Sequence, residues 1–268
     1  MNAIPLTYWD LATASLLLAA NGVLSAILGL GIAGRLAIAA LRMLVQLLLI
    51  GLVLTWLFAQ QSPLWTGLAA LVMIGFAGYE ISARQDYALK GWWNYGLGAM
   101  SITIASTLVV MLALTTHIRP TPWYHAQYAL PILGMILGNV MTGVSLGLNT
   151  LTTTARRERA AIEARLMLGA SRGKALSGTV RQALRSGLIP LINAMSVMGL
   201  VSLPGMMTGQ ILAGAPPIEA VKYQLLIMFL IGGATGSGVI LAVYGAAHRL
   251  TDARHRLRLD RLGANSGH

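Results

Sequence analysis

The sequence predicts an all-α protein, a polytopic bundle of transmembrane helices. Of the 268 residues 56% are hydrophobic and 10% are charged, whereas about a quarter of the residues of a soluble domain are charged. The mean hydropathy is +0.70. Apolar segments of about 20 residues, the length that crosses a bilayer as a helix, recur along the chain. We therefore expect a single integral membrane domain over residues 1–268.

About seven segments are long and apolar enough to span the membrane. Short connections with polar or turn-forming residues separate them. The expected spans are Trp9–Leu30, Leu36–Phe58, Leu64–Ala83, Tyr95–Thr116, Tyr128–Leu148, Leu188–Ala213 and Tyr223–Ala247.

The basic residues predict the orientation of these spans. The connections alternate between basic and nearly neutral, and with the N-terminus outside 17 of the 19 Lys and Arg residues lie on the cytoplasmic side, as does the C-terminus. The net charge of +11 does not indicate a nucleic-acid partner, because the basic residues flank apolar spans instead of lining one face with aromatics. We expect a multi-pass protein of the inner (plasma) membrane, with lipid around it.

Several kinds of chemistry are excluded by what the sequence lacks. It has no Cys, so disulfides and thiolate metal sites are excluded. It has no Gly-x₄-Gly-Lys-Ser/Thr phosphate-binding loop, no His-Glu-x₂-His, no Gly-x-Ser-x-Gly and no clustered carboxylates. We therefore expect no catalytic residues, no cofactor bound by this chain and no enzymatic activity of its own.

The second and third spans carry charged and polar residues. Arg42 and Gln46 are four residues apart, which places them on one face of a helix. Arg42 either extends to the lipid headgroups or faces a cavity where it recruits an anion or holds a neighbouring helix. Glu80 and Arg84 have the order that favours a local ion pair at the end of the third span.

The fifth span is expected at the centre of the bundle. Its pairs Gly134/Gly138 and Gly143/Gly147 have the small-xxx-small spacing that lets helix backbones approach closely. Asn139 lies near mid-membrane, where its amide either bonds to a neighbouring helix or contacts a transported solute. The seventh span carries the same spacing at Gly232 and Gly236.

The sixth span is expected to be broken at Pro204–Gly205. Pro removes a helical hydrogen bond and Gly loosens the turn. Broken helices are where transporters place binding sites, and Met206, Met207 and Gln210 follow directly. The alternative is a kink at which the two Met side chains fill the core.

A basic segment, about residues 150–187, interrupts the apolar pattern between the fifth and sixth spans. Ala155–Leu168 is expected to be helical, with Thr154 as N-cap, Gly169 at a left-handed C-terminal position and Ser171 capping a second short helix. Such an elbow at the cytoplasmic face can dock into a soluble partner, or it only fixes the topology. The basic tail, 248–268, is expected to be solvated and topology-fixing, with contact to anionic lipid or to a partner as the alternatives.

The same segments carry a family resemblance. The motifs are Arg42-x₃-Gln46-Leu47-x₃-Gly51, Pro131-Ile132-x-Gly134-Met135-Ile136-x-Gly138-Asn139, Leu168-Gly169-Ala170, Gly199-Leu-Val-Ser-Leu-Pro-Gly-Met-Met207-x-Gly209 and Lys222-Tyr223-Gln224. Over nearly its whole length the chain resembles the Fet-type iron-export permeases, bacterial ABC-transporter membrane subunits related to plant aluminium-tolerance permeases.

The resemblance implies a permease subunit that exports iron, driven by a separate cytoplasmic ABC ATPase that binds ATP and Mg. It also implies two copies of each subunit. The expected ATPase-coupling residues are Glu163, Ala164, Leu168, Gly169, Ala170 and Ser171. The expected transport pathway comprises Arg42, Gln46, Asn139, Pro204, Gly205, Met206, Met207 and Gln210.

The residue chemistry leaves alternatives to iron export open. Paired thioethers at Met206 and Met207, the candidate metal ligands, suit Cu(I) better than iron. An ABC permease for copper or an organic solute is therefore a second hypothesis, and a nucleotide-independent metal channel or secondary carrier is a third. A membrane scaffold without cargo leaves the broken sixth span unexplained.

Overall fold

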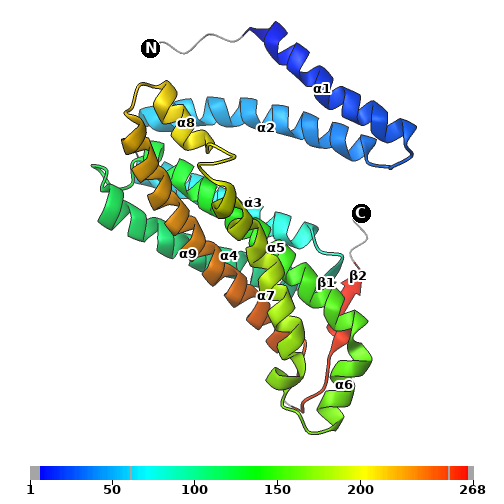
Figure 1. Ribbon diagram of the computed structural model, residues 1–268. Helices are drawn as coiled ribbons and strands as arrows, with labels where there is room; N and C mark the ends of the chain where they lie inside the picture. The colour runs from blue at the N-terminus through cyan, green and yellow to red at the C-terminus, as the bar shows by residue number, and fades with distance from the viewer. Residues whose placement is uncertain (1–6, 61, 253, 265–268) are drawn as a thin grey trace.

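The computed structural model describes residues 7–60, 62–252 and 254–264, which form a helical bundle (Figure 1). The predicted all-α polytopic fold is confirmed. In chain order the elements are α1 (Tyr8–Ile27), α2 (Ala33–Gln60), α3 (Pro63–Ala83), β1 (Tyr87–Leu89), α4 (Trp92–Leu112), η1 (Ala113–Ile118, π-helical), α5 (Ala126–Arg157), α6 (Arg159–Met167), α7 (Arg172–Val197), α8 (Gly205–Leu212), α9 (Pro217–Arg249), η2 (Leu259–Arg261, 3₁₀) and β2 (Leu262–Ala264).

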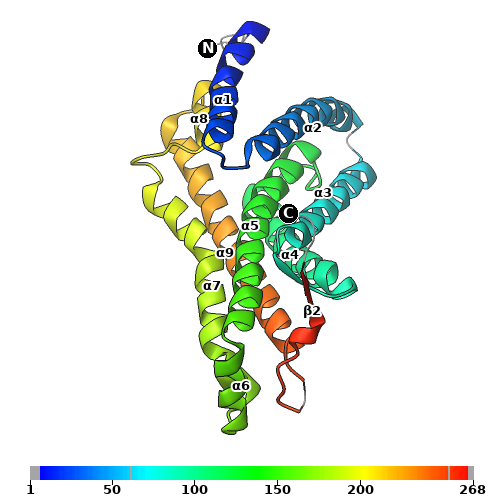
Figure 2. The same cartoon turned by 90° about the vertical axis from the view of Figure 1, so that its right-hand side faces the viewer.

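Helix α5 is the centre of the bundle, as predicted. It packs against α3, α4, α7 and α9, and Figure 2 shows it running the length of the molecule between α7 and α4. Ile136, Val140 and Val144 of α5 are fully buried and belong to one continuous apolar core with Val239 and Val243 of α9. The core therefore depends on the contact of α5 with α9 and α7.

Glycines set the distance between the central helices. A Cβ atom at Gly187 of α7 would lie 2.7 Å from the carbonyl oxygen of Gly143, and one at Gly143 of α5 would lie 2.9 Å from the carbonyl oxygen of Gly187. A Cβ at Gly187 would also lie 2.7 Å from Cγ1 of Val239 in α9. Three helices thus meet where a side chain larger than hydrogen has no room.

Not every predicted glycine pair is used in this way. Gly147 continues the tight contact, since a Cβ there would lie 3.1 Å from Val243. Gly138, Gly232 and Gly236 have open space around the Cβ position, with no heavy atom of the described residues within 4 Å. The spacing at Gly232 and Gly236 is therefore not used for close helix contact within the described chain.

Helices α1 and α2 form an arm on the outside of the bundle. They pack on each other, and α2 makes a limited contact with α3 and α5 (Figures 1 and 2). Ser25 and Leu57 are the buried residues in the described parts of these two helices. An apolar helix that is exposed all round needs lipid or protein against it.

Six helices of the described chain are long and apolar enough to cross a membrane: α1, α2, α3, Trp92–Ile118 (α4 with η1), α5 and α9. The expected sixth span, Leu188–Ala213, is not one of them, because the break that was predicted in it divides it between α7 and α8. Its apolar part in α7, 188–197, contains ten residues, which extends about 15 Å or half of a hydrocarbon core.

The predicted break in this span is confirmed but begins before Pro204. Helix α7 ends at Val197, Met198 is extended, and Gly199 adopts a left-handed φ of 83°. The amide of Gly199 donates to the carbonyl of Ser202 at 2.9 Å, which closes a turn. Pro204 then serves as N-cap of α8, with Gly205 as the first helical residue.

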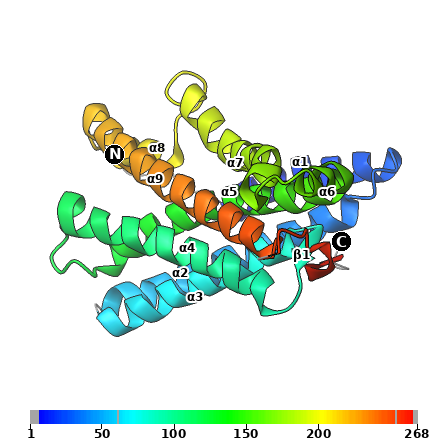
Figure 3. The ribbon, with the colours of Figure 1, turned by 90° about the horizontal axis from the view of Figure 1, so that it is seen from below.

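The described part of the C-terminal tail is folded onto the bundle, while the charged side chains of Arg254, Arg256 and Asp260 remain exposed to solvent as predicted; residues 265–268 lie outside the described residues. Strand β2 pairs antiparallel with β1, next to the end of α9 (Figure 3). Leu250 and Leu262 are buried in the core. We use the term basic end for the end of the bundle formed by α6, the first turns of α7 and this tail.

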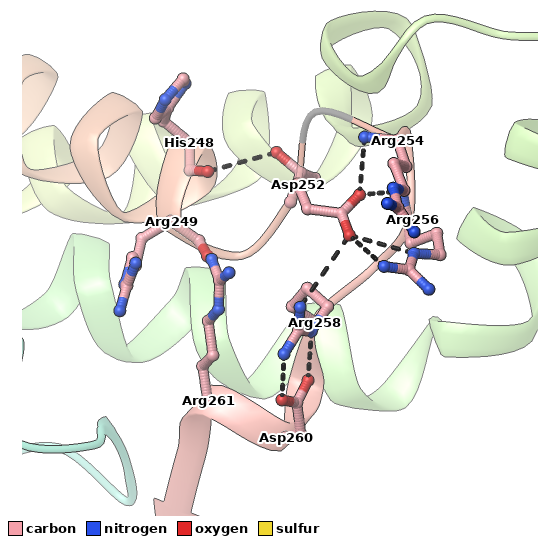
Figure 4. A network of polar contacts seen from close by, with 9 residues as sticks. His248, Arg249, Asp252, Arg254, Arg256, Arg258, Asp260 and Arg261 are labelled. Carbon is pink, nitrogen blue, oxygen red and sulfur yellow. Dashed lines mark hydrogen bonds and ion pairs between the residues drawn. The ribbon is translucent and has the colours of Figure 1, made fainter.

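Acidic residues organise the arginines of the tail (Figure 4). The carboxylate of Asp252 accepts the backbone amides of Arg254 and Arg256 at 3.0 and 2.9 Å. Arg258 donates two hydrogen bonds to Asp260, at 2.9 and 2.8 Å, and these hold the pKa of Asp260 at about 2. The backbone hydrogen bond from Arg256 likewise lowers the pKa of Asp252.

Replacing Gly187 by Ala should destabilise the protein by about 1–3 kcal/mol, because the added methyl group meets a backbone carbonyl that has to move. The measurement is thermal unfolding in detergent. Gly236→Ala is the matched control and should leave the melting temperature unchanged or raised, since Ala favours a helix over Gly by about 0.5–1 kcal/mol. Equal effects of the two changes would contradict the assigned three-helix contact.

Asp252→Asn should loosen the tail at neutral pH. The pKa of Asp252 is lowered in the folded tail, so its contribution is present above the ordinary Asp pKa of 3.8 and lost on acidification. The neutral amide removes it at any pH. We expect trypsin to cleave after Arg254, Arg256 and Arg258 several-fold faster, as measured by mass spectrometry of the released C-terminus. Asp10→Asn, at the capping box of α1, should change nothing there.

Candidate functional site

The basic segment between α5 and α7 forms a compact elbow. Helix α5 continues beyond its apolar part to Arg157 because no Gly or Pro interrupts it, and it kinks at Glu158 into α6. Thr154 is therefore buried inside α5, and its prediction as an N-cap was wrong. The predicted second short helix is the start of the 26-residue α7.

Gly169 and Ser171 have the conformations that were predicted. Gly169 is left-handed, with φ 85°, and its amide donates to the carbonyl of Leu166 at 3.0 Å. The amide of Ala170 donates to the carbonyl of Arg165 at 3.0 Å, which completes a Schellman motif. The hydroxyl of Ser171 accepts the amide of Lys174 at 3.4 Å and caps α7.

The elbow is anchored to the bundle on its inner side. Ile162 of α6 is fully buried in the same core cluster as Ala175 and Leu176 of α7. The guanidinium of Arg165 donates to the carbonyl of Ala175 at 3.3 Å. These contacts fix α6 to α7, so the elbow and α7 form one ordered unit.

The outer side of the elbow exposes apolar residues. Met167 is 83% exposed and Leu168 is 88% exposed, and Figure 2 shows α6 projecting at the far tip of the molecule. Glu163 forms an ion pair with Arg159 at 2.8 Å, and Ala164 is exposed beside it. A hollow of about 640 Å³ adjoins this tip, lined by Arg165, Leu168, Gly169, Ala170, Ser171, Lys174, Ser177 and Gly178. The structure thus brings all six predicted coupling residues together.

Arg42 of the predicted pathway forms an ion pair with Glu80 of α3. Glu80 also accepts a hydrogen bond from Arg84 at 3.4 Å, so the predicted local pair exists within a larger group. Arg42 thereby holds a neighbouring helix, through a carboxylate. Gln46 lies one turn further along α2 and is exposed.

Asn139 lies on an exposed face of α5. Its amide donates to the carbonyl of Met135 in its own helix at 2.8 Å, in place of the helix–helix bond that was one of the two expectations. Thr142 donates to the carbonyl of Gly138 at 2.9 Å on the same face. The central helix therefore presents a polar strip, Gly138, Asn139 and Thr142, that the described bundle does not cover.

The residues after the break lie on α8, against α9. Met206 and Met207 are half-buried at consecutive positions, which point about 100° apart around a helix. Met206 packs against the core cluster. The residues of the predicted pathway thus lie on three different helices. Arg42 and Gln46 are in α2, Asn139 is in α5, and Pro204–Gln210 form the start of α8.

Among the described residues no group of three or more His, Cys, Asp or Glu side chains could hold a metal ion.

A comparison with known proteins shows the family of the chain: the model of the uncharacterised protein family UPF0014 matches residues 8–251. This chain belongs to the UPF0014 family. The match runs from α1 to the residues just after α9 and includes the elbow and the break.

Curated relatives support the assignment. A UPF0014 membrane protein of Synechocystis sp. is 40% identical over 207 residues, which cover 76% of this chain and 78% of the relative. "Probable iron export permease protein FetB" of Escherichia coli is 32% identical over 221 residues, 82% and 83% of the two chains. "Protein ALUMINUM SENSITIVE 3" of Arabidopsis thaliana is 33% identical over 218 residues, 81% and 78%. No solved structure matches the chain.

These relatives confirm the resemblance drawn from the motifs, because they include a protein named as a probable iron export permease and a plant aluminium-sensitivity protein. Three features of this UPF0014 chain were missed in the sequence. The pair Arg42–Glu80 joins residues 38 positions apart. The ring of His255 accepts the amide of Arg172 at 3.3 Å, which brings the tail to the elbow. Gln224 of α9 lies beside Met198 at the break. No local pattern indicates such contacts between distant segments.

Proposed function

We propose that this chain is the membrane-spanning permease subunit of an ATP-driven metal exporter, and that a separate ABC ATPase binds at the elbow. The observation that carries the proposal is the exposure of Met167 and Leu168 at the tip of an ordered elbow. The ATPase supplies ATP and Mg, for which this chain has no phosphate-binding loop.

The surroundings of the tip favour a protein partner over lipid. Eight Lys and Arg residues lie within thirty positions of this segment, and such residues stay on the water side of a membrane. Large apolar side chains held outward among charges mark an interaction site. The Schellman motif at Gly169 and the buried Ile162 keep the tip in one conformation, so that binding costs little ordering entropy.

Two rigid helices connect this elbow to the membrane part. Helix α5 enters α6 at Glu158, and α7 leaves from Ser171 and continues to the break at Met198–Pro204. We propose that closure of the ATPase dimer moves the elbow, that α5 and α7 re-pack, and that the break absorbs the displacement and opens a cavity outward. A nucleotide-independent channel or secondary carrier binds no ATPase and therefore does not require an exposed apolar tip.

The relatives support a proposal for the cargo, and the uncovered faces support one for the assembly. We propose iron as cargo, because the Escherichia coli relative is named as a probable iron export permease; copper and organic solutes are the alternatives. The α1–α2 arm and the polar strip on α5 are faces for lipid and for a second permease copy. The basic end then faces the cytoplasm, in the inner (plasma) membrane.

Gly169→Val should abolish coupling while the permease still inserts and folds. The left-handed φ of 85° disfavours any residue with a Cβ by roughly 1–2 kcal/mol. The strain that Val introduces there should tilt the elbow. Gly173→Val, in the first turn of α7 with open space around it, is the matched control. The measurement is Fe(II)-stimulated ATP hydrolysis by the reconstituted two-subunit complex. Wild-type complex without such stimulation would refute the proposed function, and normal coupling in Gly169→Val would refute the role of the elbow.

Leu168→Ser should weaken co-purification with the ATPase by about 10-fold or more, since burying a Leu side chain in a partner contributes about 1.5–3 kcal/mol. Thermal stability of the isolated permease should not change, because the side chain is 88% exposed and makes no core contact. Leu212→Ser, an exposed Leu at the end of α8, controls for a general loss of apolar surface. Equal retention of the ATPase by both variants would argue against the tip as its binding site.

A further inference from the structure

A groove between α7 and α9 opens at the basic end. It has a volume of about 310 Å³, and its walls include Arg172, Leu176 and Val180 of α7 and Tyr244, Ala247 and His248 of α9. The two helices run in opposite directions and meet closely at Gly187 and Val239. Arg172 and His248 therefore lie toward the end of the groove that is farther from this contact, and Val180 and Tyr244 lie toward the nearer end.

The cationic end of the groove has no counter-ion within the described chain. All eight Asp and Glu side chains of the protein form hydrogen bonds or ion pairs with residues other than Arg172. Asp252, which is closest in sequence to the groove, binds Arg256 and Arg258. The hydrogen bond of Arg172 is made by its backbone amide, so its guanidinium has no partner among the described residues. Figure 4 shows the ring of His248 directed away from Asp252.

The other end of the groove is apolar. Val180 and Ala247 are buried there, and Tyr244 is 57% exposed. The exposed side chains of Ile240 and Leu241 continue this surface one turn further along α9. A small inorganic anion would occupy the cationic end and leave the apolar end unused. A molecule with an anionic head and hydrocarbon chains matches both ends.

The groove lies at the level where a membrane surface is expected. Arg249, which follows His248, places its guanidinium over the ring of Trp93 at 4.5 Å from the ring centre. Trp92 and Trp93 begin α4 and are 77% and 49% exposed, as aromatic anchors at a membrane–water interface are. At this level the apolar end of the groove faces the hydrocarbon and the cationic end faces the headgroups.

We propose that this groove binds an anionic phospholipid from the leaflet at the basic end. A guanidinium donates two parallel hydrogen bonds to a phosphate group, and the guanidinium of Arg172 is available for this. The ring of His248 supplies a second donor from the opposite wall. Basic pockets between transmembrane helices bind anionic lipid headgroups in this way. The acyl chains then lie along Tyr244 and Leu241.

A lipid in this groove joins three parts of the basic end. Arg172 is the first residue of α7 and follows the elbow directly. Its backbone amide donates to the ring of His255 in the tail, and His248 belongs to the last turn of α9. The inference is independent of the proposed function, because lipid binding is measured on the permease alone.

The test is thermal unfolding of the purified full chain in an uncharged detergent, titrated separately with phosphatidylglycerol, phosphatidylcholine and inorganic phosphate. A ligand that binds the folded state raises the melting temperature as its concentration exceeds its Kd. We expect phosphatidylglycerol to act at lower concentrations than phosphatidylcholine, and inorganic phosphate to have no effect at these concentrations. Arg172→Gln should increase the half-saturating phosphatidylglycerol concentration about 10-fold, because it removes charge-assisted hydrogen bonds to the phosphate.

Arg181→Gln is the matched control, because it removes the same charge from an exposed position of α7 outside the groove. It should keep the wild-type response. His248→Ala, at an exposed position on the opposite wall, should weaken the response in the same direction as Arg172→Gln. Equal responses of Arg172→Gln and Arg181→Gln would show that phosphatidylglycerol binds through overall charge, and would overturn the inference. An equal shift with phosphatidylcholine, or a full shift with inorganic phosphate alone, would also overturn it.

Discussion

Gly143 of α5 and Gly187 of α7 bring two helix backbones so close that a Cβ atom on either residue would lie 2.9 Å or less from the carbonyl oxygen of the other. Val239 of α9 closes over the same point. In a membrane, where apolar side chains gain little by leaving lipid, association depends on such close packing. The buried core extends from this contact in both directions, from Ile136 to Ile162.

The ordered conformation of the elbow depends on that helix contact. Its two arms are the continuations of α5 and α7, the helices that the glycines hold together. Met167 and Leu168 are therefore connected to two closely packed helices. The helical backbone is interrupted at the other end of α7, at Met198–Pro204. This separation of a rigid lever from a broken segment is what a coupled transporter needs.

Ion pairs stabilise the two peripheral parts of the protein, the α1–α2 arm and the C-terminal tail. Arg42 ties the α1–α2 arm to Glu80 of α3, although each side chain is partly exposed. In the tail, Asp252 and Asp260 neutralise neighbouring arginines and thereby let a strongly basic segment fold against the end of α9. His255 then reaches the first residue of α7. The tail is thus a structural neighbour of the elbow, in addition to any effect it has on topology.

The sequence determined the features that follow from local physics. The helical spans follow from apolar length, the left-handed Gly169 and the cap at Ser171 from terminal hydrogen bonding, and the break from Pro204 and its flanking glycines. The proposed coupling residues could be predicted as a group because they are contiguous in the chain. The motifs around them also carried the family assignment.

Only the tertiary structure decided how distant segments meet. The small-xxx-small spacing occurs in α5 and in α9, but the spacing alone does not show that Gly143 contacts Gly187 while Gly236 is open. Glu80 pairs with Arg42, strand β2 of the tail pairs with β1, and Gln224 lies next to Met198. Each of these contacts joins residues that are far apart in the chain. Periodicity fixes which face of a helix a residue occupies, and the partner of that face depends on how the helices pack.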